Sequence, residues 1–213
     1  MPKSADKFKN SRQAKIMANS KEEAAEIGQQ YFYGEGKKKS YRKAFPCLLE
    51  AAKAGEAHCQ NLVGNSYQLG LGVERNIESS LFWYKRAASN NDKEGLLNLA
   101  LLYEKGLGVK VDLRKALSLY KRGAELGDVC AQTNLAVAYL EGLGTKQDLR
   151  EGVRWLQKAA RHGDAKAQYN LGIAYMEGEG LRRSKKYARH WLDKAAKQGH
   201  RMASRTLRRL RPD

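Results

Sequence analysis

Residues 92–126 read DKEGLLNLALLYEKGLGVKVDLRKALSLYKRGAEL, and this stretch contains one complete structural unit of the chain. Leu96, Leu99 and Leu102 recur at helical spacing in its first part, which predicts an amphipathic helix. The glycine pair in KGLG ends this helix, because glycine readily adopts the left-handed backbone of a helix stop. A second helix begins after Asp112, whose carboxylate can cap the first turn. The stretch therefore predicts a hairpin of two helices.

The hairpin recurs along the chain with a period of 36 residues. Gly-x-Gly occurs five times at this spacing, from Gly34/Gly36 to Gly178/Gly180. Two further columns keep the same register, a tyrosine before each glycine pair and an N-cap residue after it: Tyr31, Tyr67, Tyr103, Tyr139, Tyr175 and Ser40, Asn76, Asp112, Asp148, Ser184. One hairpin cannot bury both of its faces, so stacked copies predict an all-α fold, an α-solenoid.

The period also divides the chain. We expect a basic N-terminal arm over residues 1–19, flexible or helical, and a C-terminal capping helix over residues 200–213. Between them we expect five hairpins: 20–55, 56–91, 92–127, 128–163, 164–199. Ser20 and Glu23 form a capping box at the start of the first hairpin. Pro46 falls inside the first predicted second helix, which should therefore be kinked or start late.

Composition narrows the class of protein. Apolar residues make up 42% and charged residues 30% of the chain, which is typical of a folded domain. No apolar run is long enough to insert into a membrane, and the first twenty residues lack the apolar segment of a signal peptide. We expect a cytoplasmic protein, or a periplasmic or secreted one if a leader has been removed. Three irregularly spaced cysteines predict reduced, buried thiols rather than a disulfide framework: Cys47, Cys59, Cys130.

The net charge of +17 is concentrated at the two ends of the chain. Residues 1–21 carry six Lys or Arg and one Asp, and residues 181–213 carry twelve Lys or Arg and two Asp. Residues 22–180 carry 22 basic and 20 acidic side chains. Because residues 22–180 are nearly neutral, this part of the chain is not expected to bind nucleic acid. The two basic ends leave that function open.

The repeats resemble the Sel-one-like repeat (SLR) family, relatives of the tetratricopeptide repeats. The resemblance rests on the Ala-Ala, Gly-Asp, Ala-x-x-x-Leu-Gly, Tyr and Gly-x-Gly columns, as in residues 158–180, KAARHGDAKAQYNLGIAYMEGEG. Asn91 in the column of glycines and His200 in the column of aspartates depart from it. The resemblance covers about residues 20–207 and implies a right-handed superhelix that binds proteins or peptides as an adaptor or scaffold. It implies no catalysis.

Gly34-Glu-Gly36 is followed by three lysines and Ser40, which raises the question of a phosphate-binding loop. A P-loop needs another glycine five residues before Gly36, where Tyr31 stands, and a preceding strand that the sequence does not predict. The four histidines lack the spacing of metal ligands. We therefore expect no enzyme activity, no cofactor, no metal site and no catalytic residue.

By the resemblance, the first helix of each hairpin lines a concave groove. Side chains of these helices that point away from the packing columns are the predicted binding residues: Phe32, Asn65, Gln68, Leu101, Glu104, Val137, Glu141, Tyr169, Ile173, Glu177. They combine an apolar floor with a row of carboxylates, which fits an extended or helical peptide containing Lys or Arg. The alternative is that the apolar members pack between neighbouring helices and the glutamates are simply solvated.

The sequence thus predicts a protein-interaction module, an adaptor, scaffold or regulator, that is bacterial and a monomer or weak oligomer. An immunity protein that neutralises a toxin belongs to the same class. The alternative from another class is an electrostatic nucleic-acid- or anionic-surface-binding protein. Its binding residues would be the basic side chains near the C-terminus: Arg182, Arg183, Lys186, Arg205, Arg208, Arg209.

Overall fold

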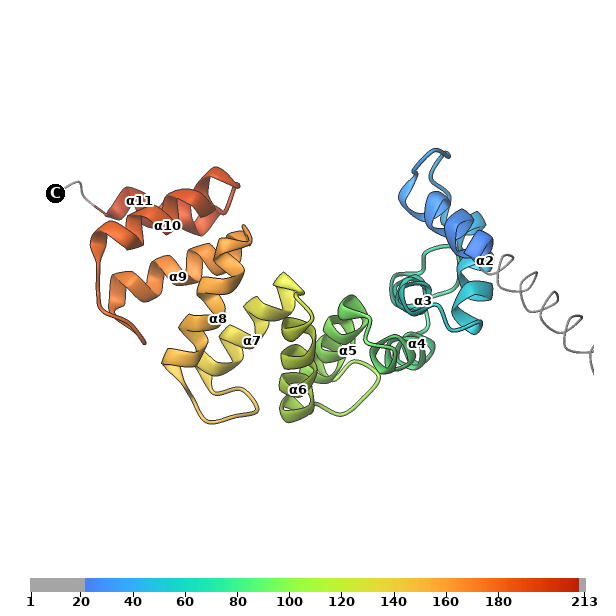
Figure 1. The fold of residues 1–213 in the computed structure, drawn as a ribbon, viewed down its shortest axis with the longest axis horizontal. Helices are drawn as coiled ribbons and strands as arrows, with labels where there is room; N and C mark the ends of the chain where they lie inside the picture. Colours follow the sequence, from blue (N-terminus) through green and yellow to red (C-terminus); the bar gives the residue numbers. More distant parts are fainter. Residues whose placement is uncertain (1–21, 211–213) are drawn as a thin grey trace, which may run out of the picture. The chain divides into compact units, whose positions relative to one another are not determined.

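The computed structural model describes residues 22–210 of the 213-residue chain. These residues form helices joined by short loops, with no strand among them (Figure 1), so the predicted all-α fold is confirmed. They belong to two compact units that divide after Gly95. The arm expected over residues 1–19, and Ser20 of the expected capping box, lie outside the described residues.

Each hairpin consists of a first helix, here called the A helix, and a second, the B helix. In the first unit the A helices are residues 22–33 and α3, and the B helices are α2 and α4: α2 Tyr41–Lys53, α3 Ala57–Leu69, α4 Ile77–Ser89. The A helix α5 (Lys93–Lys105) begins in this unit and ends in the second. There it is followed by B and A helices in turn and by the terminal helix α11: α6 Leu113–Glu125, α7 Val129–Glu141, α8 Leu149–Arg161, α9 Ala165–Glu177, α10 Lys185–Lys197, α11 Arg201–Arg209.

The capping columns fix where the helices begin. Asn76, Asp112, Asp148 and Ser184 each accept a hydrogen bond from the backbone N–H three residues later in their B helix, whereas Ser40 does not. The A helices α5, α7 and α9 are capped by aspartates whose Oδ1 accepts the equivalent bond at 2.6 Å: Asp92, Asp128, Asp164. Each bond satisfies an amide that the helix itself leaves without a partner.

Both departures from the repeat pattern keep the local cap geometry. Asn91 has a φ of 58°, which makes it the only residue other than glycine among residues 22–210 in the left-handed region. His200 caps α11, because its Nδ1 accepts a hydrogen bond from the amide of Ala203 at 3.2 Å. Asparagine tolerates the left-handed conformation better than other residues that carry a Cβ atom. The substitutions therefore change the residue type and leave the fold of the turn intact.

The A and B helices of a hairpin approach closely at a column of small residues. A Cβ atom added to Gly64 would lie 2.6 Å from the ring of Tyr84, and one added to Gly172 would lie 2.7 Å from Cγ of Leu192. The partner side chains are fully buried. Because protein interiors are packed without spare volume, glycine at these positions decides how near the two helices lie.

The second glycine of three of the Gly-x-Gly pairs, Gly72, Gly144 and Gly180, makes a different contact. A Cβ atom on Gly144 would lie 2.3 Å from the carbonyl oxygen of Leu113, and one on Gly180 would lie 2.3 Å from that of Leu149. In each case the loop of one hairpin lies against the first residue of the B helix in the hairpin before it. The recurrence of the glycine pair follows from this stacking contact.

A buried glutamine column joins successive hairpins and was not recognised in the sequence. Gln60, Gln132 and Gln168 each donate from Nε2 to a carbonyl in the last turn of the preceding B helix, at 3.1–3.2 Å. Each of these carbonyls also accepts a hydrogen bond from the glycine amide three residues later, so the glutamine supplies a second donor. The spacing of 36 residues between Gln132 and Gln168 was the available signal.

Two expectations about individual residues are corrected. α2 contains Pro46 and still begins at Tyr41, in register with the other B helices, so of the two expected outcomes, a kink or a late start, the late start is wrong. The three cysteines form no disulfide, as expected, but only Cys59 is buried, while Cys47 is half-buried and Cys130 is exposed. Cys130 lies in the first turn of α7, where its column is occupied by polar residues such as Lys166 in the next hairpin.

Candidate functional site

Three of the polar residues predicted to line the groove are hydrogen-bonded to tyrosines of the B helices. The hydroxyl of Tyr84 lies 2.6 Å from Oδ1 of Asn65 and 2.6 Å from Oε1 of Gln68. In the next hairpin the hydroxyl of Tyr120 donates to Oε2 of Glu104 at 2.5 Å. A buried tyrosine hydroxyl needs such a partner, so these three side chains contribute to the fold.

Burial and this hydrogen bond also affect the ionisation of the tyrosines. Desolvation is the largest cause that raises the pKa of Tyr120, and the hydrogen bond and charge of Glu104 raise that pKa further. Desolvation likewise raises the pKa of Tyr84. Both hydroxyls therefore stay protonated and act as donors to the A helices.

The predicted apolar and aromatic residues are half-buried. Phe32 packs beside the core of the first unit, with its ring 5.2 Å from that of Tyr41. Tyr169 and Ile173 pack against a cluster formed by α10 and α11, and the ring of Tyr169 stacks on His200 at 4.6 Å. Val137 lines a cavity of about 60 Å³ between α6 and α7. These side chains combine packing with partial exposure.

One column at the C-terminal ends of the A helices is exposed throughout: Tyr33, Leu69, Lys105, Glu141, Glu177. The expected row of three carboxylates contains Glu141 and Glu177, while Lys105 stands at the equivalent position of α5 and Glu104 is turned toward Tyr120. In the second unit the column lies beside the half-buried apolar residues, because residues four apart share one face of a helix. We call the resulting surface the A-helix strip: Leu101, Lys105, Val137, Glu141, Ile173, Glu177.

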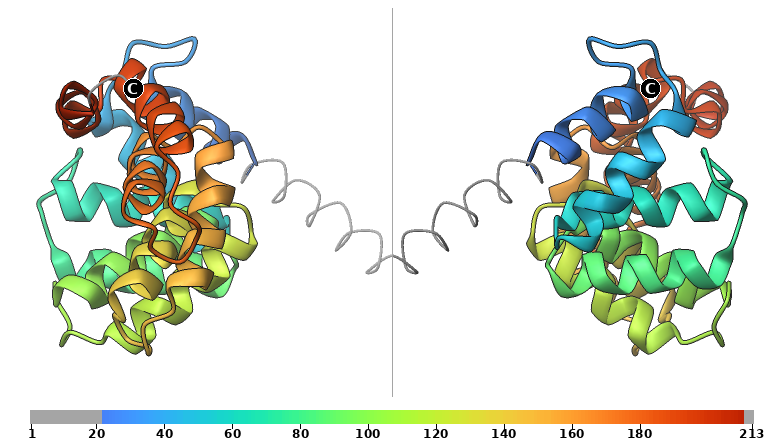
Figure 2. Two further views of the ribbon diagram at one scale, coloured as in Figure 1. Left: turned by 90° about the vertical axis from the view of Figure 1, so that its left-hand side faces the viewer. Right: turned by 90° about the vertical axis from the view of Figure 1, so that its right-hand side faces the viewer.

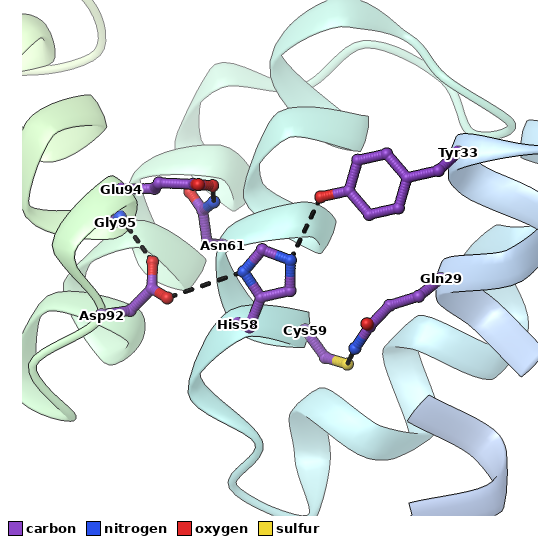
Figure 3. Close-up of polar contacts among 8 residues, drawn as sticks. All are labelled: Gln29, Tyr33, His58, Cys59, Asn61, Asp92, Glu94 and Gly95. Carbon is purple, nitrogen blue, oxygen red and sulfur yellow. Dashed lines mark hydrogen bonds and ion pairs between the residues drawn. The ribbon is translucent and has the colours of Figure 1, made fainter. Parts of the chain in front are cut away.

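The first unit has a polar cluster formed by side chains of its A helices (Figure 3). Nε2 of His58 lies 3.1 Å from the hydroxyl of Tyr33, and its Nδ1 lies 3.7 Å from Oδ2 of Asp92. Beside them Asn61 donates to Oε2 of Glu94 at 3.1 Å. The cluster connects residues 22–33, α3 and the start of α5, and the sequence did not predict these contacts.

The electrostatics of this cluster follow from its two carboxylates. The hydrogen bond with Asp92 is the largest cause that raises the pKa of His58, and the charge of Glu94 adds to it, while burial acts in the opposite direction. Burial, followed by the charge of Glu94, raises the pKa of Tyr33. Nearby, burial raises the pKa of Cys59 to about 11, so this thiol stays protonated.

The basic residues predicted near the C-terminus are all exposed. Arg182 and Arg183 lie in the loop before α10, Lys186 lies in its first turn, and the other three lie on α11: Arg205, Arg208, Arg209. Among residues 22–210 no group of three or more acidic, histidine or cysteine side chains could hold a metal ion. In the same part of the chain, no helix has the length and apolar character needed to cross a membrane.

The fold and its repeated contacts define an α-solenoid of helical hairpins. The Sel1 repeat profile matches residues 24–56, 57–92, 93–128, 131–164 and 165–200, and the chain belongs to the Sel1 repeat family. Proteins of this family generally mediate protein–protein interactions and are typically not enzymes.

Two solved structures are similar over most of this chain. A Sel1 repeat protein from Oxalobacter formigenes is 31% identical, with a TM-score of 0.80, over 86% of this chain and 73% of that one. A protective antigen of uropathogenic Escherichia coli with an SLR fold is 30% identical, with a TM-score of 0.82, over 92% of this chain and 42% of that one.

A shorter similarity links the chain to a curated protein. The chitin synthase regulator SKT5 of Saccharomyces cerevisiae is 39% identical over 61 residues, which is 29% of this chain and 9% of the yeast protein. The match therefore spans a small part of that regulator.

Proposed function

We propose that the protein is a non-catalytic adaptor or scaffold that binds a segment of a protein partner along the A-helix strip. The observation that carries this proposal is the pairing, on α7 and on α9, of a half-exposed aliphatic side chain with an exposed carboxylate four residues later. Val137 precedes Glu141 and Ile173 precedes Glu177 in this way. A surface that repeats an apolar contact beside a charge suits an extended or helical segment with matching periodicity.

The charge of the strip favours a segment with basic residues. Glu141 and Glu177 recur one hairpin apart, within a chain whose net charge is +17. Local carboxylates on a basic protein select for Lys or Arg in the ligand and against acidic segments, because like charges brought together at an interface are costly. The apolar members contribute contact area. Glu104, which accepts a hydrogen bond from Tyr120, lies next to Lys105 of the strip.

The proposal is tested by panning a displayed library of random peptides on the immobilised chain. We expect the selected peptides to combine Lys or Arg with apolar residues. The double variant Glu141→Lys/Glu177→Lys should weaken their binding by about tenfold or more, since it replaces attraction with repulsion. Isothermal titration with one selected peptide measures the change.

A matched control places the same charge change on B helices. Glu50 and Glu125 are exposed on α2 and α6, so Glu50→Lys/Glu125→Lys alters the net charge equally and leaves the strip intact. We expect this variant to bind the selected peptide within a factor of about two of the parent chain. Equal weakening of both variants, or of neither, would show that the strip is not the binding surface.

A further inference from the structure

The last two helices of the second unit carry a concentrated positive charge. Residues 181–210 contain eleven Lys or Arg side chains and one carboxylate, that of Asp193, a net charge of +10. α10 and α11 pack against each other at the C-terminal end of this unit (Figures 1 and 2). All eleven basic side chains are exposed, and eight of them form what we call the α10–α11 basic surface: Arg182, Arg183, Lys186, Arg189, Arg201, Arg205, Arg208, Arg209.

α11 presents its arginines on one face. Arg201, Arg205 and Arg208 are spaced by four and three residues, which places them along one side of the helix. The opposite side packs on α10, where Ala203 is fully buried and Leu207 contacts the cluster around Leu192. This packing holds the arginine row in a fixed orientation. With a rise of about 1.5 Å per residue, the row spans roughly 10 Å.

The acidic side chain in this region does not neutralise the surface. Oδ2 of Asp193 lies 2.7 Å from Nζ of Lys197, a residue outside the basic surface. Among residues 22–210, no ion pair involves Arg182, Arg183 or an arginine of α11. Positive side chains held together without counter-charges repel one another, and a bound polyanion would remove that repulsion.

We propose that the α10–α11 basic surface binds the phosphate backbone of double-stranded nucleic acid without sequence preference. Seven of the eight residues are arginines, whose planar guanidinium groups donate paired hydrogen bonds to phosphate oxygens. Duplex DNA presents one phosphate per strand about every 3.4 Å along its axis, so a row of roughly 10 Å matches about three phosphates. Counterion release on binding supplies the affinity.

The observations favour a duplex over other polyanions. Single-strand recognition uses stacked aromatic side chains, and the exposed Tyr187 of α10 already packs beside Tyr175, with ring centroids 5.2 Å apart. A helix that enters a lipid surface needs a free apolar face, whereas that of α11 is packed on α10. The basic surface and the A-helix strip share no residue, so this inference can fail while the proposed function stands.

The test measures binding of the full chain to a fluorescent, mixed-sequence duplex DNA by polarisation, at salt concentrations from about 50 to 200 mM. Arg205→Glu/Arg208→Glu should weaken binding at the lowest salt by about tenfold or more and make the slope of log K against log salt shallower by about two. A duplex of unrelated sequence and a duplex RNA should respond in the same way.

Control variants separate the surface from net charge and from folding. Lys38 and Lys110 are exposed loop residues, so Lys38→Glu/Lys110→Glu changes the net charge equally and should leave the slope within about half a unit of the parent value. Arg205→Lys/Arg208→Lys keeps the charge and should keep the slope. If circular dichroism shows that Arg205→Glu/Arg208→Glu is unfolded, Arg182→Glu/Arg183→Glu is tested in its place. These two residues lie in a loop away from the α11 packing, and we expect the same weakening of binding and the same change of slope.

Three results would overturn the inference. The first is equal loss of binding in the Lys38/Lys110 variant, which would indicate non-specific attraction to the whole chain. The second is tighter binding, under the same conditions, to phosphatidylserine vesicles or to polyglutamate than to duplex DNA, which would assign the surface to a membrane or an acidic protein. The third is the absence of duplex binding by the parent chain at the lowest salt.

Discussion

A buried glutamine in the second unit has an acceptor atom without a partner. Oε1 of Gln60 accepts from Asn90, and Oε1 of Gln168 accepts from Gln198, each thirty residues further along. Oε1 of Gln132 has no partner among the described residues, and the position thirty residues further along is His162. A buried polar atom left without a hydrogen bond costs free energy of folding.

Replacing His162 with asparagine should repair this site. The introduced side chain would occupy the position that Asn90 holds in the earlier hairpin and could donate from its amide nitrogen to Oε1 of Gln132. His162→Asn should therefore raise the free energy of unfolding by about 1 kcal/mol. Urea denaturation followed by circular dichroism measures the change. His162→Ala removes the imidazole without supplying a donor, and a gain of the same size in that variant would contradict the explanation.

Between elements, His58 ties the start of α5 to α3 through Asp92. The neighbours of its imidazole are Asp92, which caps α5, Glu94 in the first turn of α5, and Tyr33 from residues 22–33. Asp92 raises the pKa of His58 above the ordinary value of 6.5. A histidine with a raised folded-state pKa stabilises the fold fully below its unfolded pKa, and that stabilisation is lost as the pH rises through the folded value.

His58→Gln should therefore destabilise the protein more at pH 5 than at pH 8. The difference in the free energy of unfolding between the two pH values should be at most about 1 kcal/mol, because the imidazole is 36% exposed and water screens the pair. Urea melts of parent and variant at both pH values measure it. In an Asp92→Asn background, which keeps a capping oxygen, the same His58 substitution should lose most of its pH dependence, and persistence of that dependence would rule out Asp92 as the cause.

The helices could be predicted from the sequence because their signals are local. Glycine pairs and capping residues lie within a few positions of the helix ends they determine, and the period repeats them. The contacts of the candidate site depend on residues far apart. Asn65 and Glu104 were predicted to be free for a ligand, but each meets a tyrosine sixteen or more residues away, and the A-helix spacing contains no information about that partner.

The polar cluster of the first unit was missed for the same reason. His58 and Asp92 belong to successive hairpins and occupy different columns of the repeat, so the 36-residue period does not align them. The A-helix strip was only partly predicted. Glu141 and Glu177 share a column, whereas Glu104 lies one position away from it, and one position turns a side chain about 100° around a helix.

At the scale of the whole molecule, repeated hairpins predict that a local defect stays local, because each repeat contacts only its neighbours. Gly172→Ala would place a methyl group 2.7 Å from Cγ of the buried Leu192 and should cost about 1–3 kcal/mol of stability through overpacking between α9 and α10. Native-state hydrogen exchange detects such local loss of stability. We expect amide protection to fall in α8 to α11 and to remain unchanged in α2 to α4.

The reciprocal substitution lies in the other unit. Gly64→Ala would place a methyl group 2.6 Å from the ring of Tyr84, and it should lower amide protection in α2 to α4 while sparing α9 to α11. Opposite patterns from two equivalent substitutions would show that the two units open independently, as a chain of nearest-neighbour contacts requires. A uniform fall in protection across both units, in either variant, would instead mean that the described chain unfolds as one cooperative body and that the division after Gly95 has no energetic counterpart.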